Sequence, residues 1–239
     1  MKNLFKIHLF TYVLAIIMIL MGKFKIYLYF TLVLFIHEIG HIIMAIFFKW
    51  NIKKIIILPF GILLKFEDNL NKSLKEEFII AIMGIVFQIV FVFFIHNKDI
   101  IFASNIILFF NILPIYPLDG SKIVNIILNK ITNFKTSYFL TLIISYITIV
   151  ILIAITIINR TLIIFIALIP LLFNLFTLIL TKRQVFLKFL LERYLYDFGF
   201  KRLKKVKDLN EFKRDYYHFI YKNNNYIEEK EYLNSYFNS

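Results

Sequence analysis

Apolar residues dominate the chain in six long runs that short polar stretches separate. The runs cover residues 7–21, 26–48, 78–95, 100–117, 138–158 and 162–180. A helix needs about 17–25 such residues to cross the hydrocarbon core of a bilayer. The pattern therefore predicts an all-α polytopic membrane protein with six transmembrane helices. No small-residue cleavage site follows the first run, so we expect a retained span rather than a signal peptide.

Composition supports a membrane protein over a soluble one. Of the 239 residues, 60% are hydrophobic and 18% are charged, whereas soluble domains average about 45–50% and about 25%. These values exclude a disordered chain, a coiled coil and an ordinary soluble enzyme. The chain has no cysteine, which excludes disulfides, thiolate metal ligands and a cysteine nucleophile.

The basic residues predict the topology. With both termini in the cytoplasm, 24 of the 28 Lys and Arg residues fall on the cytoplasmic side. This asymmetry satisfies the positive-inside rule. The net charge of +13 is then explained by topology and by attraction to anionic lipid. We expect no nucleic-acid partner, because no nucleic-acid-binding motif accompanies the charge.

Two segments are neither span nor simple loop. Residues 55–66 are apolar but too short to span, and turn-forming Pro59 and Gly61 interrupt them. They predict a short membrane-associated β-hairpin or re-entrant loop, with an apolar loop packed on the helices as the alternative.

We divide the chain into a membrane domain, 1–181, and a small cytoplasmic tail, 182–239. The tail predicts an amphipathic surface helix over 183–197, and we expect His218 within it to be exposed.

The second apolar run contains the motif His37-Glu38-Ile39-Gly40-His41. Residues four apart share one face of a helix, so both imidazoles can bind one Zn²⁺ with the glutamate beside them as general base. These are the only Asp, Glu, His, Lys or Arg residues between Lys25 and Lys49. Each charged group at mid-bilayer costs about 2.5–3.5 kcal/mol, which favours a functional role over a polar cluster that joins helices.

A catalytic zinc needs a third protein ligand and an open position. Asp119 is the best candidate, because Pro114 and Pro117 break the fourth run just before it. The chain can then unwind and fold the carboxylate back toward the metal, which a protein-lined cavity tolerates. Asn111 precedes the break, where its amide can bind substrate backbone or an oxyanion, or make a plain interhelical hydrogen bond.

Together these motifs resemble the site-2 protease family, peptidase family M50, of intramembrane zinc metalloproteases. The similar stretches are FIHEIGH, IIILPFG, LKEEF, NILPIYPLDG and KFLLERY, and they extend over most of the first 195 residues. The resemblance implies that His37, His41 and Asp119 bind one Zn²⁺ and that Glu38 is the general base. It also places Asn111 near the substrate.

The resemblance to the sporulation branch of this family implies particular partners. Such proteases cleave a membrane-associated pro-sigma factor precursor in the mother-cell membrane around the forespore, and inhibitory membrane proteins regulate them. Many carry a CBS domain after the last span, and the short tail predicts only an incomplete CBS-like remnant. Ile62, Ser121 and Ile85 stand where the family has Gly, Gly and Pro. These departures concern loop geometry, since none removes a ligand.

The predicted function is peptide hydrolysis within the membrane. The substrate must be extended, because a helix shields its own backbone. The hairpin around Pro59, Phe60 and Gly61 can hold such a strand by β-augmentation. A metal or proton transporter and an inactive relative that only binds a partner are the alternatives. A transporter would need polar residues in several spans, and an intact ligand set argues against the inactive relative.

Overall fold

A computed structural model describes residues 5–7, 9–58, 61–66, 70–160, 162–222 and 225–238. The chain divides into two compact units. Unit 1 comprises Met1–Asn69 and Phe78–Ile112, and unit 2 comprises Leu70–Glu77 and Leu113–Ser239. Helix α3 (Leu74–Phe93) therefore begins in unit 2 and continues through unit 1.

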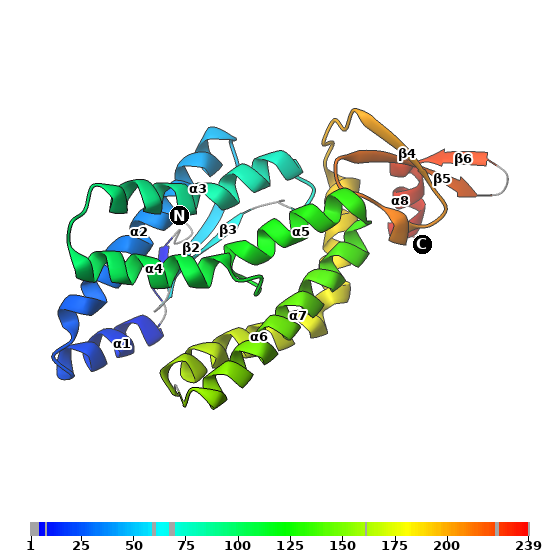
Figure 1. Ribbon diagram of the computed structural model, residues 1–239. Helices are drawn as coiled ribbons and strands as arrows, with labels where there is room; N and C mark the ends of the chain where they lie inside the picture. The colour runs from blue at the N-terminus through cyan, green and yellow to red at the C-terminus, as the bar shows by residue number, and fades with distance from the viewer. Residues whose placement is uncertain are drawn as a thin grey trace. The chain divides into compact units, whose positions relative to one another are not determined.

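Unit 1 combines helices with a small sheet (Figure 1). Its helices are α1 (Leu9–Leu20), α2 (Phe24–Phe47), most of α3, and α4 (Lys98–Ile112). Its strands are β1 (Phe5–Ile7), β2 (Ile52–Leu58) and β3 (Gly61–Phe66). The order is β1-β2-β3, with β1 parallel to β2 and β3 antiparallel to it. The isoleucines of β2 favour a strand because their branched side chains suit an extended backbone.

Helix α2 is the centre of unit 1. It packs against α4, where Val33, Ile100 and Ile107 form a buried cluster. Near its end, Ala45 lies in a second cluster with Ile80 of α3. Its buried positions thus face α3 and α4, which encloses the polar residues that α2 carries between them.

Unit 2 contains three consecutive helices and the tail. The helices are α5 (Asp119–Ile131), α6 (Phe134–Ile158) and α7 (Leu162–Leu195). α6 and α7 lie side by side (Figure 1). Asn133 begins α6 by accepting a hydrogen bond from the Thr136 N–H, which satisfies one of the free donors at the helix start.

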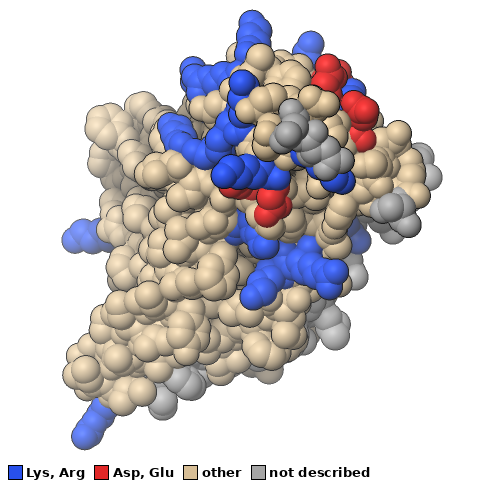
Figure 2. All heavy atoms as spheres, turned by 90° about the vertical axis from the view of Figure 1, so that its right-hand side faces the viewer, with Lys and Arg blue, Asp and Glu red and all other residues tan. Residues whose placement is uncertain are grey.

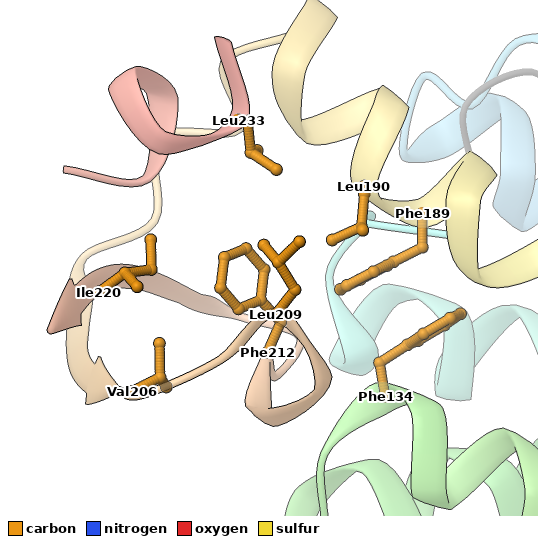
Figure 3. Packing of buried hydrophobic residues seen from close by; sticks show 8 residues of the cluster. All are labelled: Phe134, Phe189, Leu190, Val206, Leu209, Phe212, Ile220 and Leu233. Carbon is orange, nitrogen blue, oxygen red and sulfur yellow. The ribbon is translucent and has the colours of Figure 1, made fainter. Parts of the chain in front are cut away.

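The tail folds around a core of its own, which α7 and the start of α6 help to form. Its elements are β4 (Arg202–Val206), the 3₁₀ turn η1 (Leu209–Glu211), β5 (Tyr216–Lys222), β6 (Asn225–Glu228) and α8 (Glu229–Phe237). β5 pairs parallel with β4 and antiparallel with β6. Figure 3 shows the buried cluster: Phe134, Phe189, Leu190, Val206, Leu209, Phe212, Ile220 and Leu233. The rings of Phe134 and Phe189 stack with centroids 3.9 Å apart.

Among the described residues, four helices are long and apolar enough to cross a membrane, rather than six. They are α2, α3, α6 and the Leu168–Leu195 part of α7. α1 has 12 residues and α4 has 15. Fifteen residues extend about 22 Å, short of a hydrocarbon core of about 30 Å. α4 ends at Ile112, two residues before the helix-breaking Pro114.

Other expectations also differ from the structure. The chain is mostly helical, but the all-α class omits two three-stranded sheets. The expected hairpin is present as β2 and β3, and β1 adds an unexpected third strand; Pro59 and Phe60 lie outside the described residues. The expected surface helix over 183–197 is the end of α7, which continues unbroken through the boundary set at 181. His218 is buried rather than exposed.

Candidate active site

His37 and His41 lie one turn apart on α2 and are both buried. Their rings meet edge to face, with centroids 4.8 Å apart. Their Nε2 atoms are 3.1 Å apart. The spacing of four residues therefore brings two imidazole nitrogens to one point, as the sequence predicts.

The other nitrogen of each ring has a partner on α3. His41 Nδ1 lies 2.7 Å from the backbone oxygen of Ile80, which can only accept a hydrogen bond. His37 Nδ1 lies 2.9 Å from Oε1 of Gln88. The Gln88 amide is itself oriented, because its Nε2 donates to the backbone oxygen of Ser104 at 2.9 Å. Both Nδ1 atoms therefore carry the proton and donate.

In the neutral imidazole this arrangement makes both Nε2 atoms acceptors, and these two atoms face each other across 3.1 Å. The lone pairs of two such acceptors repel each other unless a cation or a proton lies between them. Two nitrogens on one tetrahedral Zn²⁺, with bonds of about 2.0–2.1 Å, lie about 3.3 Å apart. Ring orientation by a second hydrogen bond is the usual arrangement at metal sites. The pair thus fits one zinc ion.

Two glycines allow α2 and α3 to approach this closely. A Cβ on Gly40 would lie 2.3 Å from the backbone oxygen of Met83 in α3. A Cβ on Gly84 would lie 2.3 Å from His41 Nε2 and 2.9 Å from His37 Nε2. Any larger side chain at Gly84 would therefore occupy the space between the two histidine Nε2 atoms and α3.

Sequence reasoning did not identify Gln88 or Gly84 as site residues. Gln88 is the sole polar side chain in the apolar run 78–95, and it is fully buried. A lone amide within an apolar span costs free energy unless it has partners, so its position alone indicates a role. The partners themselves depend on how α2, α3 and α4 cross, which the sequence pattern does not specify.

Glu38 and Asp119 supply two buried carboxylates. Glu38 lies on α2 beside His37 and is 8% exposed. Asp119 begins α5 in unit 2 and is 3% exposed. The positive end of the α5 dipole stabilises its charge, and Lys122 Nζ lies 2.7 Å from its Oδ1. Asn111 lies half-buried in the last turn of α4.

Unit 1 thus supplies two buried imidazoles, His37 and His41, and unit 2 supplies a buried carboxylate, Asp119. Two imidazoles and one carboxylate match the donor set of catalytic zinc sites, which leave the fourth position open. The absence of cysteine also disfavours softer, thiolate-binding metals. The residues present therefore fit zinc.

Comparison with known proteins places these residues in a family context. Residues 25–97 match the profile of peptidase family M50. The chain is 36% identical over 148 residues to stage IV sporulation protein FB of Bacillus subtilis, covering 57% of this chain and 51% of that protein. It is 30% identical over 107 residues to a zinc metalloprotease of Methanocaldococcus jannaschii, covering 40% and 32%. The chain thus spans about half or less of these relatives.

A solved structure shares the fold. The site-2 protease from Methanocaldococcus jannaschii superposes with a TM-score of 0.56 at 20% sequence identity. The match covers 72% of this chain and 89% of that chain. The four long apolar helices among the described residues indicate, by their length and composition, an integral membrane protein. The profile match and the relatives support peptidase family M50, and the solved structure shows a shared fold.

Proposed function

Starting from the match of residues 25–97 to peptidase family M50, we propose that the protein is an intramembrane zinc metalloprotease. One observation carries this proposal. The Nε2 atoms of His37 and His41, two buried residues of the apolar helix α2, lie 3.1 Å apart. The buried carboxylate of Asp119 completes a three-ligand set in this proposal.

Glu38 is the proposed general base. Zinc in such a site lowers the pKa of water to about 7 and polarises a carbonyl. Glu38 takes the proton from the attacking water and delivers it to the leaving amine. Its burial on the helix that carries both histidines supports this role. Asn111 binds the substrate backbone or the developing oxyanion.

The substrate is proposed to bind as an added strand. Among the described residues, β3 pairs only with β2, so its other edge can accept an extended peptide. β3 begins at Gly61, directly after the expected contact residues Pro59 and Phe60. This arrangement exposes the scissile backbone that a helical substrate would conceal.

The similarity to a sporulation protein suggests the biological setting. We propose a membrane-associated pro-sigma factor as substrate and membrane proteins as regulators, in the mother-cell membrane around the forespore. Both termini face the cytoplasm in this proposal. Tail residues 182–239 hold 13 of the 28 Lys and Arg residues. Figure 2 shows Lys and Arg side chains gathered over the upper part of one face, with Asp and Glu side chains among them. A net basic tail is expected beside anionic lipid.

Co-expression with a tagged candidate pro-sigma factor tests the proposal. Wild type and the exposed-site control Glu231→Gln should cleave it, whereas Glu38→Gln and Asp119→Ala should not. Purified Glu38→Gln should keep its zinc, whereas Asp119→Ala should lose it. Cleavage by Glu38→Gln at the wild-type rate would exclude the assigned base. A wild-type protein that binds no zinc would exclude the metalloprotease.

A further inference from the structure

One turn of the tail contacts the helices that carry or orient the site residues. This turn, residues Phe212–Asp215, lies between η1 and β5 and is called the 212–215 turn below. Its contacts join residues more than 70 positions apart in the chain.

The 212–215 turn holds the start of α3. The Leu74 N–H, one of the donors that a helix start leaves free, points at the Asp215 carboxylate, 3.3 and 3.4 Å from its two oxygens. A negative charge there also favours the helix dipole. Arg214 Nη1 lies 2.6 Å from Glu77 Oε2 in the first turn of α3, and Arg214 Nη2 donates to the Lys72 backbone oxygen at 2.7 Å.

The same turn holds the corner between α5 and α6. Lys213 Nζ donates to the backbone oxygen of Ile131, the last residue of α5, at 2.8 Å. A positive charge at a helix C-terminus is favourable. The Phe134 N–H, at the start of α6, donates to the Phe212 backbone oxygen at 2.9 Å. Every residue of the turn therefore contacts α3, the segment before it, or this corner.

The turn is held in one conformation. Asp215 has a φ of 62°, a left-handed backbone that residues with a Cβ adopt at a cost in free energy. The buried guanidinium of Arg193, on α7, donates to the Lys213 backbone oxygen at 2.8 Å and to the Tyr216 backbone oxygen at 3.1 Å. Arg193 also pairs with Glu229 of α8 at 2.6 Å. Backbone strain that the surrounding contacts maintain, as at Asp215, indicates a position with a functional role.

α3 and α5 lead from this turn to the site residues. Further along α3, the Ile80 backbone oxygen and Gln88 orient the two histidines, and α5 begins at Asp119. We propose that the 212–215 turn is a brace that positions α3 and α5, so that zinc affinity depends on the folded tail. This proposal rests on the proposed zinc site. Asp215 and Arg214 are positioning residues that act through these helices.

Zinc affinity of the purified full-length protein in detergent tests the brace. Asp215→Gly removes the carboxylate but keeps the left-handed backbone accessible, and Asp215→Asn keeps an acceptor and also tolerates that backbone. Competition between the protein and a chelator for Zn²⁺ should show a zinc affinity roughly tenfold lower for Asp215→Gly than for wild type. This is the smaller of the losses in metal affinity that follow substitution of residues that support metal ligands. Asp215→Asn should stay close to wild type. Hydrogen exchange at residues 74–80 should be faster in Asp215→Gly.

Further variants keep the test informative. Glu77→Gln, at a partly exposed side chain, weakens the Arg214 pair with little risk to folding and should also reduce zinc affinity. Hydrogen exchange over 202–237 serves as the control, and wild-type protection there would show that the tail of each variant remains folded. If Asp215→Gly shows faster exchange at residues 74–80 but wild-type zinc affinity, the proposal is overturned. Unchanged exchange at these residues would show that Asp215 does not hold the start of α3. A wild-type protein without zinc affinity would instead refute the proposed function.

Discussion

Replacing Gly84 with alanine is expected to abolish zinc binding while the helices stay folded. The new Cβ would lie 2.3 Å from His41 Nε2. Unbonded carbon and nitrogen atoms settle at about 3.5 Å, so the ring must move by about 1 Å. Zinc–ligand distances tolerate only about ±0.2 Å. A second clash, at 2.9 Å from His37 Nε2, prevents compensation by that ring.

The expected magnitude separates this effect from a general loss of stability. Alanine improves helix propensity by about 1 kcal/mol over glycine, whereas overpacking costs about 1–3 kcal/mol. The net change in the free energy of unfolding is therefore small. Zinc affinity, in contrast, should fall by about 100-fold or more, since the proposed metal ligands themselves would be displaced.

Metal analysis of the purified protein measures the effect. Wild type should contain one zinc per chain and Gly84→Ala should contain almost none after dialysis against a weak chelator. Val86→Ala, on the exposed side of the same helix, is the matched control and should keep its zinc. Thermal unfolding should differ little between the two variants. Full zinc content in Gly84→Ala would refute the view that the metal lies between these histidines and α3.

Three further predictions concern the supporting residues. Gln88→Leu leaves the His37 Nδ1–H without its acceptor and should weaken zinc binding about 10–100-fold, as chelator competition would show. Arg193→Met removes the buried guanidinium that pairs with the Glu229 carboxylate and leaves that carboxylate with His218 as its remaining partner, so the tail should lose about 3–5 kcal/mol of stability, measured by hydrogen exchange. Burial lowers the pKa of His218 below its ordinary value. The unfolded tail therefore binds the proton first, and tail stability should fall by up to about 1.4 kcal/mol per pH unit as the pH drops below about 6.5. His218→Gln should remove most of that slope.

The convergence of His37 and His41 is accessible to sequence reasoning because it depends only on helix geometry. His37 and His41 meet on one face of α2 as soon as the segment is helical. Pro114 likewise predicts the end of α4, since a proline lacks the required donor. Local rules of this kind need no knowledge of how helices pack.

Features that depend on packing were not predictable in the same way. Hydropathy counted residues 100–117 as one span, because the residues around the prolines are apolar even though the helix ends at Ile112. The sequence predicts an exposed His218 in the polar tail, yet this side chain stacks on Phe212 and contacts Glu229. The sequence alone does not distinguish a titratable side chain that is buried with a partner from one that is exposed at the surface.

The unbroken course of α7 makes the tail sensitive to rotational phase. A helix turns by about 100° per residue, so one inserted residue would rotate everything beyond it by that angle. Arg193 and Phe189 would then leave the face that meets Asn71 and the tail core. An insertion of seven residues nearly restores the angle, being close to two full turns. Length variation in this protein should therefore be tolerated in loops but, between Leu168 and Phe189, only in steps that keep the phase of the helix.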